Sequence, residues 1–193
     1  HFGHSNLQVS GAETTSELPK KYILFVGTRK IYKNFDFFVH AIAPLLNKDK
    51  NLNLICAGTE FDKNEINNFN ILNISDQLRS YLVDGEDLSN LYKNALCFVF
   101  PSLYEGFGLP TLEAFSYGCP AIISDNSCMR EIGGSAAVYI NPESQEDILD
   151  KVENIIYNSD LRNEMAMNGF KKIQEFSWMK CAEKTLSVYE SIV

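Results

Sequence analysis

Two glutamates eight positions apart bracket a glycine-rich turn, in residues 105–113, which read Glu-Gly-Phe-Gly-Leu-Pro-Thr-Leu-Glu. Residues 97–101 before the turn form an apolar run typical of a strand, and residues 110–117 after it are typical of a helix. Glycines let the backbone come close to a ligand, and the free N–H groups at a helix start attract phosphates and hydroxyls. Glu105 and Glu113 could accept hydrogen bonds from hydroxyls at the two ends of that ligand. The motif therefore fits a molecule with ribose at one end, a diphosphate in the middle and a hexose at the other.

The same turn also has an interpretation that involves no ligand. Turns of this glycine-proline type join strands to helices in many α/β proteins, and the helix dipole alone favours a glutamate in the first helical turn. The nine residues by themselves do not decide between the two interpretations, so the decision depends on the rest of the chain.

Apolar runs that end in glycine alternate with amphipathic segments along the chain. Residues 22–26 are continuously apolar and end in Gly27, as buried parallel strands do. Residues 53–57 repeat this pattern before Gly58. Further strands are expected at 81–83, 97–101, 121–124 and 138–140, and helices at 35–46, 63–69, 87–94, 110–117, 128–133, 145–157, 160–174 and 178–192.

This alternation predicts an α/β fold, a Rossmann-like doubly wound parallel sheet with helices on both faces and a helical C-terminus. Ligands of such sheets bind beyond the carboxyl ends of the strands. Gly27, Gly58 and Glu105 each follow a predicted strand, so they should meet at that edge.

Composition and charge narrow the class of protein. The 193 residues are 45% hydrophobic, which is ordinary for a globular domain with its own core. A formal net charge of -8 argues against general nucleic-acid binding, because a polyanion would be repelled. The five cysteines are odd in number and lack a C-x-x-C pair, which favours a reducing compartment and predicts a cytoplasmic protein. The sequence shows no apolar run long enough for a membrane span and no signal-peptide pattern at its start.

The surroundings of the glycine turn resemble a known family. Residues 101–114, followed by Gly-Cys-Pro-Ala-Ile-Ile-Ser at 118–124, closely resemble the donor-binding signature of the group-1 (family 4) glycosyltransferases, retaining enzymes with two Rossmann-like domains (the GT-B fold). Further matches stand in the family's order at 25–29, 33–35, 57–58, 88–95, 131–142 and 176–189. The resemblance covers residues 20–193 and is specific because it rests on many ordered matches.

The resemblance implies a donor-binding site and a role for each of its residues. Lys33 and Arg29 would offset the negative charge that develops on the β-phosphate of the leaving nucleoside diphosphate. Glu105 would hold sugar hydroxyls as the catalytic residue, and Glu113 would hold the ribose. The expected donor-binding residues are Gly27, Thr28, Arg29, Lys33, Gly106, Phe107, Gly108, Leu109 and Glu113. Many family members carry arginine directly after the strand glycine, whereas Thr28 intervenes here, so the expectation rests more on Lys33 than on Arg29.

No metal or organic cofactor is expected. The three histidines and the acidic residues show no metal-ligand spacing, which agrees with the metal-independent family. Phe107 either packs under the turn or touches the sugar. The apolar stripe from Phe176 to Tyr189 is expected in the core or in a domain contact.

The resemblance also implies the domain organisation. Residues 1–19 are polar and aperiodic and are expected to be a flexible linker between domains, while residues 20–193 would form the nucleotide-sugar-binding domain. An amino-terminal domain of the same enzyme, absent from this chain, would bind the acceptor and could provide peripheral membrane contact. This fragment alone would then be inactive.

The expected activity is transfer of a hexose from a nucleoside-diphosphate sugar to a hydroxyl acceptor, by a mannosyltransferase or glucosyltransferase of polysaccharide biosynthesis. Two alternatives stay open. One is a nucleotide-sugar epimerase or phosphorylase of the same architecture, and the other is a non-catalytic nucleotide-sugar-binding module. The sequence leaves open the sugar, the nucleobase (GDP, UDP or ADP), the acceptor and the oligomeric state.

Overall fold

The computed structural model describes residues 18–126 and 128–192, so the expected linker at 1–19 lies almost entirely outside the described residues. The described strands are β1 (Tyr22–Val26), β2 (Asn53–Ala57), β3 (Leu78–Tyr81), β4 (Cys97–Phe100), β5 (Ala121–Ser124) and β6 (Ala137–Ile140). The α-helices are α1 (Phe35–Lys48), α2 (Lys63–Ile71), α3 (Gly85–Asn94), α4 (Leu109–Ser116), α5 (Met129–Gly133), α6 (Gln145–Tyr157), α7 (Ser159–Ile173) and α8 (Trp178–Glu190). Two short 3-10 helices are η1 (Ile31–Lys33) and η2 (Ser75–Gln77).

The strands form one parallel sheet in the order β3-β2-β1-β4-β5-β6. The chain moves outward from the central β1 to β3, then returns to β1's other side with β4 and moves outward again. The predicted Rossmann-like, doubly wound parallel sheet is therefore confirmed. The strand order itself was not predicted, because the sequence pattern gives the elements and not their neighbours.

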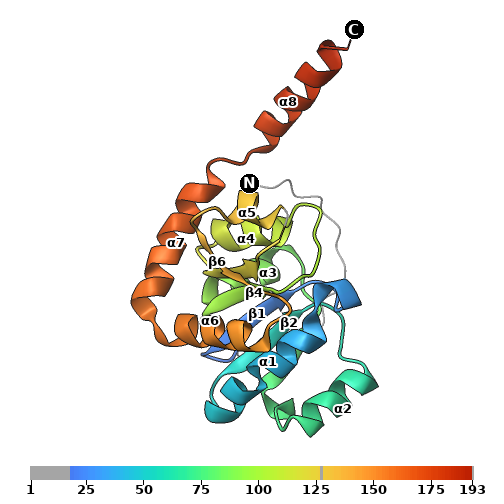
Figure 1. Ribbon diagram of the computed structural model, residues 1–193, viewed down its shortest axis with the longest axis vertical. Coiled ribbons are helices and arrows are strands. Elements are labelled where there is room, and N and C mark those ends of the chain that lie inside the picture. The colour runs from blue at the N-terminus through green and yellow to red at the C-terminus, as the bar shows by residue number, and fades with distance from the viewer. Residues whose placement is uncertain (1–17, 127, 193) are drawn as a thin grey trace.

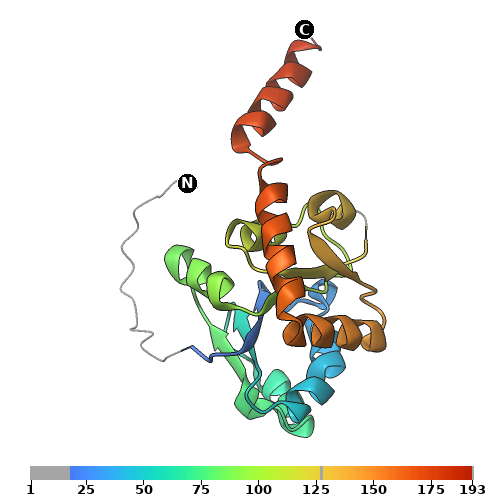
Figure 2. The same cartoon turned by 90° about the vertical axis from the view of Figure 1, so that its left-hand side faces the viewer.

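Two apolar layers enclose the sheet, and β1 shows why. Successive side chains of a strand point to opposite faces, so Ile23 and Phe25 pack with α1 and α6, while Tyr22 and Leu24 pack with α3, α4 and α5. In Figure 2, α3 (green) and α1 (blue) lie on opposite sides of the sheet. Burial on both faces explains why β1 reads as a continuous apolar run.

The predicted strand at 81–83 is wrong. β3 lies at Leu78–Tyr81 and pairs with β2, and Leu82 beyond it is largely exposed. β3 is an edge strand that carries Arg79 and Ser80, so it lacks the continuous apolar run of a central strand. By contrast β1, β5 and α6 begin and end at the predicted residues.

The last helix does not join the core. None of the described residues of α8 is buried, and Figure 1 shows α8 projecting away from the rest of the domain. The expectation of a core position is therefore wrong for the α8 part of the stripe from Phe176 to Tyr189, and a domain contact stays a prediction. Among the described residues, no helix has the length and apolar character to cross a membrane.

Candidate functional site

The order in which the chain adds strands reverses between β1 and β4, which makes this the switch point of the sheet. Residues that follow these two strands meet there. Lys33 ends η1, which follows β1, and Glu105 follows β4. The Lys33 Nζ donates a hydrogen bond to Glu105 Oε1 at 2.7 Å. In open α/β sheets, ligands bind beyond the carboxyl ends of the strands at this switch point. Two residues expected at the site, 72 positions apart, are thus brought into contact there.

The Lys33–Glu105 ion pair is partly withdrawn from water. Each side chain is 12% exposed, and the Lys33 Nζ stands 4.5 Å from the centroid of the Phe100 ring. The Leu103 N–H donates to the Tyr32 carbonyl at 2.8 Å, which fastens the loop after β4 to the loop after β1. Because low exposure weakens screening by solvent, the two charges act strongly on each other and on any ionic ligand beside them.

The two glycines of the turn have different functions in the backbone. Gly108 caps α4 with φ of 91°, a conformation that favours glycine. A Cβ there would lie 2.9 Å from the Sδ of the flexible Met129 side chain, which would have to shift. Gly106 lies outside the positive-φ set, and a Cβ there would meet no described atom within 4 Å. The conformation of the turn therefore requires Gly108, whereas Gly106 leaves open space above the backbone. The approach of a ligand to these glycines stays a prediction.

The start of α4 is oriented toward the same edge. No described side chain caps it, and Pro110 occupies its second position rather than the first. Leu109 and Phe107 are exposed beside it. Pro110 has no N–H, and the Thr111 N–H donates to the Gly108 carbonyl at 2.9 Å. The Leu109 N–H and the positive end of the helix dipole are therefore what the start of α4 can offer an anion.

Glu113, one turn further into α4, lines an apolar cavity of about 440 Å³. The cavity lies between the start of α3, one side of α4 and the segment from the end of α7 to the start of α8. Its lining includes Gly85, Leu88, Phe107, Leu109, Leu112, Tyr117, Ile173, Phe176, Trp178 and Cys181. A carboxylate at the edge of an apolar cavity can accept hydrogen bonds from a diol whose attached ring is buried.

Tyr92 on α3 positions the Glu113 carboxylate. Its hydroxyl lies 3.2 Å from Glu113 Oε2 and 3.3 Å from the Pro110 carbonyl oxygen. Burial first, and then the Glu113 charge, raise the pKa of Tyr92 well above its usual range. Tyr92 therefore stays protonated and donates. The sequence placed Tyr92 in a helix but gave no sign of this contact, since 21 positions separate the two residues.

Arg29 contacts other groups than the Lys33–Glu105 pair. Its Nη1 donates to the Thr59 carbonyl at 2.8 Å and its Nη2 to the Glu60 carbonyl at 2.7 Å. It also forms a two-pronged ion pair with Glu65 and stacks 4.9 Å from the Phe61 ring centroid. These contacts fasten the end of β1 to the start of α2. A role of Arg29 at the donor's phosphates stays a prediction, and the hydrogen bonds in place argue against it.

The remaining expected residues lie along the same edge. Thr28 is exposed, directly after Gly27, whose φ is 120°. A Cβ on Gly58 would lie 2.8 Å from the Gly27 carbonyl oxygen, so the ends of β1 and β2 approach closely. The Phe107 ring meets the Phe176 ring edge-on, with centroids 6.3 Å apart, and also lines the cavity. Phe107 therefore packs beside the turn without being buried.

Two residues after β5 hold the Glu105 loop, and the sequence gave no signal for either. The Asn126 Nδ2 donates to the carbonyls of Ser102 and Leu103 at 2.8 and 3.0 Å. The Cys128 Sγ lies 3.3 Å from the Glu105 carbonyl oxygen. The segment after β5 thus holds the backbone of the Glu105 loop in place.

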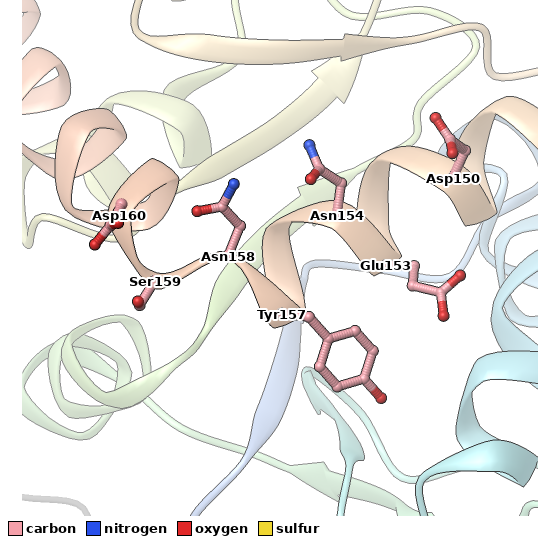
Figure 3. Close-up of a pocket in the computed structure, with 7 residues that line it drawn as sticks. All are labelled: Asp150, Glu153, Asn154, Tyr157, Asn158, Ser159 and Asp160. Atoms are coloured by element: carbon pink, nitrogen blue, oxygen red, sulfur yellow. The ribbon is translucent and has the colours of Figure 1, made fainter.

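A second hollow lies at the opposite edge of the sheet. An open groove of about 600 Å³ is lined by the end of α6 and the start of α7. Figure 3 labels its lining residues, which are Asp150, Glu153, Asn154, Tyr157, Asn158, Ser159 and Asp160. The Tyr157 hydroxyl contacts Asp49, which follows α1 and so marks the amino-terminal edge of the strands. The groove is therefore remote from the predicted site. The described residues include no cluster of three or more His, Cys, Asp or Glu side chains suited to a metal ion.

A comparison with family models identifies the group to which the chain belongs. The model described as "Glycosyl transferases group 1" matches residues 11–172. The chain belongs to the group 1 glycosyl transferases. The switch-point residues Lys33 and Glu105, the glycine turn and Glu113 all lie within the matched range.

Relatives of this glycosyl transferase chain carry named activities. It is 35% identical over 108 residues to O-antigen chain mannosyltransferase B of Escherichia coli, covering 56% of this chain and 28% of that protein. It is 28% identical over 137 residues to O-antigen chain mannosyltransferase RfbU of Salmonella typhimurium, covering 70% of this chain and 38% of that protein. The matched segments thus cover well under half the length of these relatives.

A solved structure confirms the fold of this group 1 chain. The C-terminal domain of a glycosyl transferase group 1 family protein (LpcC) from Francisella tularensis superposes with a TM-score of 0.72. The match covers 82% of this chain and 87% of that domain at 24% sequence identity. At this identity the likeness concerns the fold alone.

Proposed function

We propose that the chain is the donor-binding domain of a retaining glycosyltransferase, which transfers a hexose from a nucleoside-diphosphate sugar to a hydroxyl acceptor. The Lys33–Glu105 pair at the switch point carries this proposal. The pair offers a cation and a carboxylate at the place where the fold binds ligands, and the start of α4 stands next to it in sequence.

The chemistry of the site matches the three parts of such a donor. The cavity beside Glu113 takes the nucleoside, with the carboxylate on the ribose hydroxyls. Lys33 and the free N–H groups of the turn take the diphosphate, and Glu105 takes sugar hydroxyls. Lys33 and the positive end of α4 stabilise the charge that grows on the leaving diphosphate. In this proposal these groups carry out that task without a metal ion or an organic cofactor.

The relatives favour one hexose. The two named above are O-antigen chain mannosyltransferases, so we propose mannose as the transferred sugar, in the synthesis of a polysaccharide. The acceptor would bind to an amino-terminal domain of the complete enzyme. We further propose a cytoplasmic location, because the thiols of Cys56, Cys97 and Cys119 are buried, unpaired and suited to a reducing compartment.

A thermal-shift screen with GDP-mannose, GDP, UDP-glucose and ADP-glucose tests the proposal. A ligand at one hundred times its dissociation constant adds about 2.7 kcal/mol to the unfolding free energy. For a domain of this size that raises the melting temperature by roughly 5–10 °C. A shift with at least one nucleotide sugar supports the proposal, and no shift at millimolar concentrations of any of them contradicts it.

The alternatives make other predictions for the complete enzyme. Group 1 membership does not favour an epimerase or a phosphorylase. A non-catalytic binding module would bind the nucleotide sugar and neither transfer nor hydrolyse it when the whole protein is assayed. Release of the nucleoside diphosphate by the whole protein, dependent on an acceptor, therefore separates the enzyme from the module.

A further inference from the structure

Lys33 and Glu105 neutralise each other at the place where the diphosphate is proposed to bind. The Nζ to Oε1 distance is 2.7 Å, and among the described residues each is the other's salt-bridge partner within 4.0 Å. A diphosphate that reaches Lys33 therefore also comes within a few ångströms of the Glu105 carboxylate. This separation is shorter than the screening length of about 8 Å at physiological salt, so the two negative charges repel.

The loop that carries the Glu105 carboxylate is held close to Lys33. The backbone of this loop is held by Asn126 and Cys128 on one side and by Tyr32 on the other. The Glu105 side chain is only 12% exposed. If Lys33 pairs with a phosphate instead, solvent therefore stabilises the negative charge of Glu105 poorly. A buried carboxylate left without its partner is costly, and the ligand must supply a replacement donor.

We propose that Glu105 sets a preference for the intact nucleotide sugar over the bare nucleoside diphosphate, by competing with the diphosphate for Lys33. The intact donor brings sugar hydroxyls that satisfy Glu105 while its phosphates take Lys33. The nucleoside diphosphate takes Lys33 and leaves Glu105 unsatisfied. After transfer of the sugar, renewed pairing of Lys33 with Glu105 favours release of the diphosphate product. This inference rests on the proposed function of the site.

The competition predicts that a substitution in the binding site strengthens ligand binding. Removal of a carboxylate from the binding site should tighten binding of the bare diphosphate, because Lys33 is freed and the repulsion is lost. Glu105→Ala and Glu105→Gln should each bind GDP, UDP or ADP, whichever binds the unaltered chain, about tenfold more tightly, a change of 1.4 kcal/mol. In both variants the preference for nucleotide sugar over nucleoside diphosphate should fall by at least the same factor.

The chain offers a matched control. Glu153 pairs with Lys48 at 2.6 Å, with the same residue types and charge change, but it lies on α6 at the groove near the opposite edge of the sheet. Glu153→Ala should leave both affinities unchanged, which separates a local competition from a general effect of net charge. Glu105→Gln keeps the shape and a hydrogen-bonding group, so it reports on the charge even if Glu105→Ala folds poorly.

Titration calorimetry on the 193-residue chain decides between the outcomes. Tighter binding of the nucleoside diphosphate to both Glu105 variants, with Glu153→Ala unchanged, supports the inference. Unchanged or weaker binding to Glu105→Gln overturns it and leaves the proposed donor site in place. If no nucleotide binds any form, the proposed function fails, and pyrophosphate then serves as the probe of Lys33. Tighter pyrophosphate binding to Glu105→Gln would still support the competition, and equal binding would overturn it.

Discussion

At the scale of single residues, the contact between Tyr92 and Glu113 determines how the second glutamate can act. The Tyr92 hydroxyl donates to Glu113 Oε2, and its pKa is raised far above its usual range by burial and by the Glu113 charge. The proton therefore stays on the tyrosine at neutral pH. Glu113 also lines the adjoining cavity, where its carboxylate can accept further hydrogen bonds from a ligand.

We predict that Glu113→Ala weakens binding of nucleoside and nucleoside diphosphate alike, by about 1.5–3 kcal/mol, the range for hydrogen bonds to a charged group. Tyr92→Phe keeps the Glu113 carboxylate and removes only the hydrogen bond that positions it. The binding free energy should therefore weaken by only about 0.5–1.5 kcal/mol. Calorimetry with a nucleoside and its diphosphate measures both changes. A loss confined to the diphosphate would remove Glu113 from the ribose.

Arg29 and Lys33 both follow β1, but their contacts assign them different tasks. The Arg29 guanidinium is nearly buried against Glu65, the loop carbonyls of Thr59 and Glu60, and Phe61. Arg29→Ala would leave the Glu65 carboxylate without its partner, so we predict a loss of about 2–4 kcal/mol in unfolding free energy. Urea denaturation measures it.

Lys33→Ala should show the opposite balance. We expect diphosphate affinity to fall by about 1.5–3 kcal/mol, nucleoside affinity to stay nearly constant, and the salt dependence of diphosphate binding to flatten. Comparing Lys33→Ala with Arg29→Ala also tests the structural role assigned to Arg29. A stable Arg29→Ala chain with weakened diphosphate binding would restore Arg29 to the donor site.

At the scale of elements, the two glycines of the turn before α4 separate the needs of the fold from those of the ligand. Gly108 has a φ of 91° and lies close to the Met129 side chain, whereas a Cβ added at Gly106 would contact no described atom. We predict that Gly108→Ala lowers the unfolding free energy by about 1–3 kcal/mol and that Gly106→Ala changes it by less than about 0.5 kcal/mol.

Gly106→Ala should instead weaken the binding of nucleotide sugar at least tenfold, or 1.4 kcal/mol, because the added methyl group occupies the space above the backbone. Melting curves and calorimetry on the same two variants test this. A Gly106→Ala chain that binds the donor normally would show that no ligand approaches the backbone at this point.

The start of α6 gives a dependence of stability on pH. Partial burial alone would raise the pKa of Asp147, but hydrogen bonds from the Lys151 Nζ and the Asn141 backbone N–H outweigh it and lower the pKa. As pH falls below the unfolded value of about 3.9, the unfolded chain takes up the proton first and the folded state loses this contribution.

We therefore predict that the stability difference between the unaltered chain and Asp147→Asn is fully present above about pH 5 and shrinks toward pH 2. Melting temperatures of both forms across this range provide the measurement. A difference that stays constant with pH would mean that the charge of Asp147 contributes nothing to stability.

At the scale of the whole molecule, the sequence predicts the parts that have local causes. β1 and β5 could be located because a strand buried on both faces requires an unbroken apolar run, and α6 because its apolar residues recur on one face. β3 was misplaced because Arg79 and Ser80 on an edge strand interrupt that pattern. The strand order and the exposure of α8 depend on contacts between distant segments, which no local pattern contains.

The same distinction holds for the site. The glycine turn with Glu105 and Glu113 was visible because nine consecutive residues carry it. The Lys33–Glu105 pair spans 72 positions and the Arg29–Glu65 pair spans 36, so only the folded chain shows that one cation points to the switch point and the other to α2. The anchoring by Asn126 and Cys128 was invisible for the same reason.

The last prediction concerns what this chain can do alone. Its matched segments cover 28% and 38% of the two mannosyltransferases described above, and its proposed donor site lies at the carboxyl edge of the sheet. Catalysis needs an aligned acceptor and exclusion of water from the reacting atoms. We expect the 193-residue chain to bind the donor, to transfer no sugar and to hydrolyse it slowly or not at all. Supplying the rest of the enzyme, as one chain or as a separate protein, should restore transfer, measured as acceptor-dependent release of the nucleoside diphosphate. Steady transfer by this chain alone would require a complete active site within its described residues.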